Sequence, residues 1–66
     1  MGRADKHDRA SKTHRDTAKR HDEAAEFWDK QDDAENAELE RRNAKIERDA
    51  ADLEADRARL HRKRRT

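Results

Sequence analysis

The pattern of apolar positions is clearest in the second half of the chain, where a large apolar side chain stands at every seventh residue. A second, more polar set stands three residues before each of these. The large residues are Leu39, Ile46, Leu53 and Leu60, and the second set is Asn36, Asn43, Ala50 and Arg57. Two such positions in every seven are typical of a coiled coil, in which helices pack along a seam. We therefore predict that the four large residues hold a helix–helix seam together.

The first half of the chain repeats the same spacing with different residues. One position holds His7, His14, His21 and finally Trp28, and the other holds Ala4, Ser11, Ala18 and Ala25. The two halves are out of phase, because the step from Trp28 to Leu39 is not a multiple of seven. Such a change of phase requires either a turn or an insertion of four residues in a continuous helix.

The segment between the two halves reads "DKQDDAENAE". Asp32 or Asp33 can cap the start of a helix, and Glu35 follows Asp32 at the spacing of a capping box. Neither Gly nor Pro marks the end of the preceding helix. The local signals therefore leave both a turn and a continuous helix open.

An antiparallel fold about Asp32 places a small residue beside each large one. It pairs Ala25 with Leu39, Ala18 with Ile46, Ser11 with Leu53 and Ala4 with Leu60. The layers between them pair Trp28 with Asn36, His21 with Asn43, His14 with Ala50 and His7 with Arg57. This small-on-large match coincides with the capping signal, and it favours a hairpin. The predicted seam residues are therefore Ala18, Ala25, Trp28, Leu39, Ile46, Leu53 and Leu60.

We predict an all-α fold, an antiparallel helical hairpin that forms a two-helix coiled coil. Residues 1–66 form a single helical unit, with helices over about 4–31 and 33–62, a turn over about 31–33 and a basic tail over 62–66. One long helix that dimerises as an antiparallel coiled coil about Asp32 makes the same layers.

Composition supports helix but leaves little for a core. The chain has 66 residues, of which 53% are charged, with no Pro, no Cys and a single Gly. Its abundant Ala, Glu, Arg and Lys are good helix formers. Chains this short usually need a disulfide, a metal or a second chain for stability. Without cysteine, we expect a homodimer or a helical protein partner, and disorder until a partner binds remains an alternative.

The histidines admit three interpretations. As polar members of the seam, His7, His14 and His21 would fix its register. As a pH-sensitive seam, they would bring charge into the interface on protonation, first at His7, which would face Arg57. A metal site is disfavoured because residues seven apart lie about 10.5 Å apart along a helix. We predict no metal and no cofactor.

The charges are arranged in blocks. Residues 1–21 hold seven Lys or Arg and three Asp, and residues 22–56 hold five Lys or Arg and fourteen Asp or Glu. Residues 57–66 hold six basic residues and no acid. A hairpin would gather both basic blocks at one pole. The possible polyanion contacts there are Arg57, Arg59, Arg62, Lys63, Arg64 and Arg65, which could touch phosphates of a nucleic acid.

Two further features lie outside the predicted seam. Phe27 is one position away from Trp28 and points elsewhere. A row of small residues runs along the second helix: Ala37, Ala44, Ala51 and Ala58. This row reflects either simple helix propensity or, together with Phe27, a second face that packs in a dimeric four-helix bundle or docks a partner helix.

The segment "HDEAAEFWDKQDDAENAE" resembles the helix–turn–helix join of a single tetratricopeptide-like helix pair, as in short Ala/Arg/Glu-rich proteins of high-GC bacteria. The resemblance covers residues 21–38. The family's usual Gly at the turn is replaced by Gln31 and Asp32, and its Pro is missing. A repeat array needs about three units. The resemblance implies a hairpin and a binding role, without naming a ligand.

The function predicted from these features is non-catalytic. There is no Cys nucleophile, the single Ser is a seam residue, and no Gly-rich phosphate loop is present. We expect a small helical interaction or assembly protein that docks to itself or to a protein partner. The alternative is a nucleic-acid or ribosome-associated factor that uses the basic pole.

Location is predicted from the absence of two sequence signals. No run of 18 apolar residues could span a membrane, and the first residues lack the apolar core of a signal peptide. We therefore expect a cytoplasmic protein without membrane contact.

Overall fold

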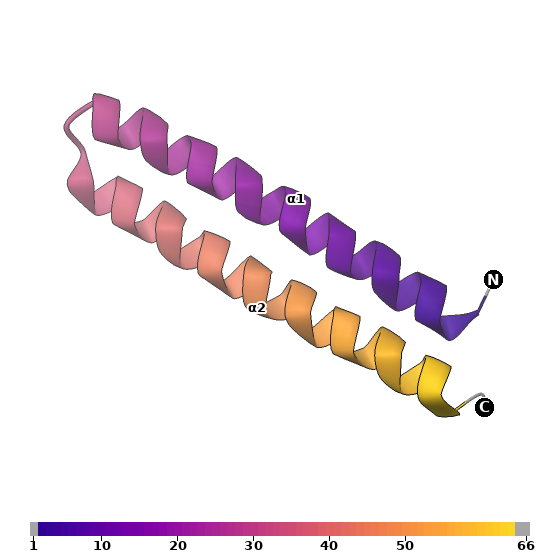
Figure 1. Cartoon of the computed structure of the whole chain (residues 1–66). Helices are drawn as coiled ribbons and strands as arrows, with labels where there is room; N and C mark the ends of the chain where they lie inside the picture. Colours follow the sequence, from indigo (N-terminus) through magenta and orange to yellow (C-terminus); the bar gives the residue numbers. More distant parts are fainter. Residues whose placement is uncertain (1, 65–66) are drawn as a thin grey trace.

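The computed structural model describes residues 2–64 as two long helices joined by a short turn (Figure 1). Helix α1 spans Arg3–Lys30 and helix α2 spans Ala34–Arg64. The helices run antiparallel and side by side, so both chain ends lie at the same end of a rod measuring 53 × 16 × 8 Å. The predicted all-α antiparallel hairpin is confirmed, and the chain turns instead of continuing as one helix. Residues 62–64 of the predicted basic tail belong to α2.

The turn ends α1 without the glycine that usually does so. Asp32 adopts a left-handed backbone conformation with φ of 57°. The N–H of Asp33 donates to the Trp28 carbonyl at 2.9 Å, and the N–H of Asp32 donates to the Asp29 carbonyl at 3.1 Å. This is a Schellman motif, and Asp tolerates the left-handed position better than most residues.

The start of α2 is capped by the next residue along. One carboxylate oxygen of Asp33 accepts the backbone N–H of Asn36 at 3.0 Å, and the other accepts the Asn36 side-chain amide at 2.7 Å. These hydrogen bonds lower the pKa of Asp33. The predicted cap is therefore correct for Asp33, whereas the predicted capping box of Asp32 with Glu35 is wrong, because Asp32 belongs to the turn.

The core of the hairpin is a seam of small residues. Ala4, Ser11, Ala18 and Ala25 of α1 are buried, as are Ala37, Ala44, Ala51 and Ala58 of α2. The Ser11 hydroxyl donates to the Ala51 carbonyl at 2.9 Å, which fixes the register of the two helices. With Ser11 level with Ala51, the spacing of seven places every small residue of α1 beside an alanine of α2. Small side chains allow the two backbones to approach closely.

The predicted seam is correct for α1 and wrong for α2. Ala18 and Ala25 are buried as predicted, and Trp28 is partly buried. The large residues of α2 lie outside the seam, with exposed fractions of 54% for Leu39, 63% for Ile46, 51% for Leu53 and 44% for Leu60. Helix α2 is therefore turned about its axis relative to the predicted pairing. The row of alanines that suggested a second face is the seam, and the large apolar residues lie outside it.

Candidate docking surface and histidine–glutamate seam

Each seam histidine of α1 faces a glutamate of α2. The Nδ1 atom of His14 lies 2.5 Å from a carboxylate oxygen of Glu47, and that of His21 lies 2.7 Å from Glu40. His7 makes the same contact with Glu54. The predicted partners of these histidines were Asn43, Ala50 and Arg57, and that pairing is wrong. The physical reason is that a half-buried imidazole gains a charged hydrogen-bond acceptor in the observed register.

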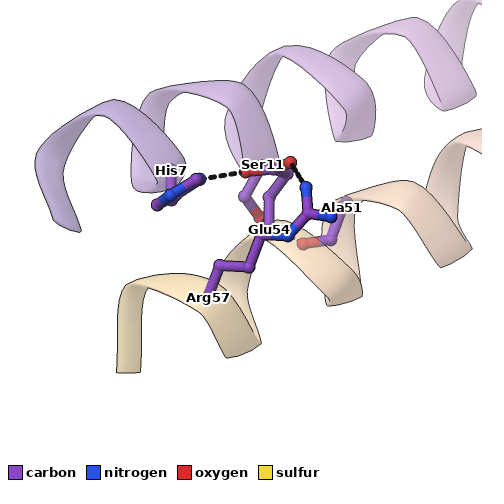
Figure 2. A network of polar contacts seen from close by, with 5 residues as sticks. All are labelled: His7, Ser11, Ala51, Glu54 and Arg57. Atoms are coloured by element: carbon purple, nitrogen blue, oxygen red, sulfur yellow. Dashed lines mark hydrogen bonds and ion pairs between the residues drawn. The ribbon is translucent and has the colours of Figure 1, made fainter. Parts of the chain in front are cut away.

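The layer nearest the chain ends carries the most contacts (Figure 2). His7 from α1 and Arg57 from α2 both approach the carboxylate of Glu54, and the Arg57 guanidinium donates to it at 2.7 Å. The hydrogen bond with His7, helped by Arg57, holds the pKa of Glu54 below its ordinary value. On its other side, His7 stacks on His61 with ring centroids 5.2 Å apart.

The expected repulsion at His7 rested on a direct pairing of His7 with Arg57. In the structure, the groups that face His7, His14 and His21 across the seam are the carboxylates of Glu54, Glu47 and Glu40. The seam histidines are therefore positioned opposite acids, and a pH-sensitive seam stays a prediction.

A row of ion pairs joins the two helices along one edge of the seam. Asp8 pairs with Arg62, Asp22 with Arg48 and Asp29 with Arg41. The contact with Asp8 raises the pKa of Arg62. The spacing of seven places Arg15 at the remaining position of α1, opposite Ala55 of α2. A hollow of about 250 Å³ lies at this break, lined by Arg15, Arg48 and Asp52.

The predicted polyanion contacts lie towards the end of α2, and three of them pair with acids of the chain itself. Arg57 pairs with Glu54, Arg59 with Asp56 and Arg62 with Asp8. Lys63 and Arg64 are exposed on the last turn of α2, and Arg65 lies outside the described residues. The gathering of both chain ends at one pole is as predicted (Figure 1). Contact with a nucleic acid stays a prediction.

The large apolar residues of α2 that lie outside the seam form a row, which we call the apolar stripe: Leu39, Ile46, Leu53 and Leu60. Its members are about half exposed and repeat every seven residues along one side of the helix. A hollow of about 400 Å³ lies at the turn end of the stripe, lined by Ala34, Glu35, Glu38, Leu39 and Arg42. The stripe can therefore accept apolar side chains from outside the hairpin.

Phe27 is a further exposed apolar residue, on α1 beside the turn. It is 55% exposed, and its ring packs edge-on against Trp28 with centroids 5.2 Å apart. The prediction that Phe27 points away from the seam is confirmed.

Sequence reasoning missed the acids that pair with the histidines. Glu40, Glu47 and Glu54 repeat every seven residues, the same spacing as the histidines. Matching these two repeats would have identified the register, because each His then faces a Glu and each small residue faces an alanine. Because leucine is more hydrophobic than alanine, hydrophobicity alone selects the row that begins at Leu39 as the seam.

Two further properties of the described residues bear on the chemistry available. Across residues 2–64, no three His, Cys, Asp or Glu side chains are grouped so that they could hold a metal ion. Within the same range, neither helix contains a stretch apolar enough to cross a membrane. Comparison with protein-family models, curated proteins and solved structures finds no match to this chain. The resemblance to a tetratricopeptide-like helix pair stays a prediction.

Proposed function

We propose that this chain is a non-catalytic helical interaction protein that docks to a protein surface through the apolar stripe. A single observation carries the proposal: the hairpin completes its own seam with small residues and leaves its largest aliphatic residues outside it. Full burial of a Leu or Ile contributes about 1.5–3 kcal/mol. Because each stripe residue is about half exposed, a docked partner that buries the rest would gain about half of that free energy at each position.

The shape of the stripe supports a helix as the partner's contacting element. The stripe residues follow one side of α2 with the spacing by which helices interlock along a seam. The positions three residues before them hold Asn36, Asn43, Ala50 and Arg57, and the first three of these are the small or polar neighbours found in such seams. An extended or nucleic-acid partner would not match a spacing of seven.

Site-specific photo-crosslinking tests the proposal. A benzophenone amino acid is placed at Ile46 in the stripe or, as the matched control, at Lys19, an exposed position of α1. Both versions are expressed in the cells from which the sequence comes and are irradiated. A discrete protein adduct at Ile46, absent at Lys19, is the expected result. No adduct at Ile46, or equal adducts at both positions, would refute docking through the stripe.

A further inference from the structure

We infer that the occupant of the apolar stripe is a second copy of this chain, docked antiparallel across a twofold axis at Asp49. This inference rests on the proposed function and names its partner. The charges beside the stripe carry it, because their order along α2 reverses about that residue.

Two rows of charged residues lie beside the stripe, on the side opposite the glutamates that face α1. All of their members are exposed. The inner row is Glu35, Arg42, Asp49, Asp56 and Lys63, and the outer row is Glu38, Lys45, Asp52 and Arg59. Both rows follow the spacing of seven. The inner row is next to the stripe around the helix, so it lines the edge of any helix–helix contact made by the stripe, and the outer row lies behind it.

Within each row, residues at matching distances on the two sides of Asp49 carry charges of opposite sign. In the inner row, acidic Glu35 corresponds to basic Lys63, and basic Arg42 corresponds to acidic Asp56. The outer row repeats this relation, with Glu38 corresponding to Arg59 and Lys45 to Asp52. All four pairs are centred within about one residue of each other, which is about 1.5 Å along a helix.

An antiparallel second copy brings these opposite charges together. Rotation by half a turn about an axis at Asp49 places Arg42 of each copy beside Asp56 of the other. The same rotation places Leu39 beside Leu60 and Ile46 beside Leu53, so the apolar residues share the axis. A parallel copy would instead place the two inner rows on opposite edges of the contact, each facing the row of Glu40, Glu47 and Glu54, without this match of opposite charges. Complementary charges of this kind set the orientation of helix pairs.

The hollow at the turn end of the stripe fits the same arrangement. It lies beside Leu39 and is bordered by Glu35, Glu38 and Arg42. In the antiparallel pair, Leu60 of the second copy enters it, and the basic residues next to Leu60 meet Glu35 and Glu38 of its border. The hollow thus matches both the apolar and the charged features of the opposite end of the stripe.

Within the two rows, like charges meet at the axis itself. There, Asp49 of each copy faces Asp49 of the other. Each already has a basic partner, because the Lys45 ammonium lies 3.1 Å from the Asp49 carboxylate. Two more pairs within the rows make similar exposed contacts along α2, Arg42 with Glu38 at 3.3 Å and Arg59 with Asp56. Pairs of this kind are weak and can be shared with a second chain.

Sedimentation equilibrium of the full chain, from micromolar to millimolar concentration, gives the first test. We expect a dimer for the natural sequence and a monomer for Ile46→Lys. A single Arg42→Asp or Asp56→Arg change should weaken the dimer about tenfold, because each acts twice in the interface. The double variant R42D/D56R should recover most of the affinity. A natural chain that stays monomeric throughout overturns the inference, as does a double variant weaker than both single ones.

Cysteine crosslinking tests the orientation, and the absence of natural cysteine keeps the result unambiguous. Asp49→Cys should couple to itself through a short bismaleimide. Arg42→Cys and Asp56→Cys should couple in a mixture of the two but not alone. Self-coupling of Arg42→Cys, without coupling in the mixture, would show a parallel pair and overturn the antiparallel one.

The photo-crosslinked product at Ile46 separates the two proposals. A product with the mass of two copies of this chain supports both. A product with a different protein, and none with a second copy, leaves docking through the stripe in place and overturns self-association. The absence of any product would refute both docking through the stripe and self-association.

Discussion

The opposed roles of Ala44 and Ile46 make the strongest prediction about this fold. Ala44 is completely buried in the seam, whereas Ile46 is 63% exposed. The two residues are separated by one position of the same helix and would exchange roles in the pairing expected from hydrophobicity. Substitutions at the two positions therefore distinguish the observed pairing of the helices from the pairing expected from hydrophobicity.

Ala44→Leu should be the more damaging of the two changes. Added methylenes in a closely packed interior cost about 1–3 kcal/mol. We expect the upper part of this range, because the helices cannot separate at Ala44 without lengthening the neighbouring contacts of His14 with Glu47 and of His21 with Glu40. Ile46→Ala should cost less than about 1 kcal/mol, since a little over a third of the side chain is buried and full burial is worth about 1.5–3 kcal/mol.

Urea unfolding followed by far-ultraviolet circular dichroism measures both costs. The experiment is run at low micromolar concentration, where self-association contributes least. Trp28 fluorescence provides a second probe beside the turn. If Ile46→Ala lowers the free energy of unfolding as much as Ala44→Leu does, the stripe is part of the hairpin's own seam and the observed register is refuted.

Three further predictions concern single contacts. Ser11→Ala should cost about 1 kcal/mol in urea unfolding, because the hydrogen bond from the buried Ser11 hydroxyl to the Ala51 carbonyl is lost, and an unchanged midpoint would contradict this. Asp32→Gly should stabilise the hairpin by about 0.5 kcal/mol by relieving the left-handed backbone, and a destabilisation would show that Asp32 has another role. Because the pKa of Glu54 is lowered in the fold, its ionised carboxylate stabilises the fold above the ordinary pKa of 4.5, and this stabilisation is lost as pH falls below 4.5 through the folded pKa. Glu54→Gln should therefore flatten the loss of helix below about pH 4.5 in a circular dichroism titration, and an equally steep loss would exclude Glu54 as its source.

The sequence was sufficient to predict two helices and the place of the turn. The phase change between Trp28 and Leu39 and the capping residues near Asp33 identify a break, and the small residues Ala18 and Ala25 identify the inner face of α1. The missing glycine obscured the end of α1, because Asp32 takes the left-handed position that glycine usually fills.

The rotation of α2 about its axis was not predicted, and the reason is the shared spacing of its rows. Ala37 and Leu39 each begin a row that repeats every seven residues, so periodicity alone does not choose between them. Hydrophobicity favours the row of Leu39, since it assumes that the largest apolar residues are inside. The hairpin instead follows the contacts between His and Glu, a property of two helices together that no single-helix pattern contains.

The break in the row of ion pairs at Arg15 has a consequence for how the hairpin keeps its alignment. A seam that repeats every seven residues tolerates sliding by seven, because alanine would still meet alanine. In the row of Asp8, however, a slide in either direction places Arg15 against an arginine, Arg62 in one case and Arg48 in the other. Only the observed alignment gives Arg15 the small, uncharged Ala55. The one apparently misplaced charge of the row thus marks the correct alignment, and a chain whose arms were lengthened by whole repeats would keep its alignment as long as that mismatch was kept.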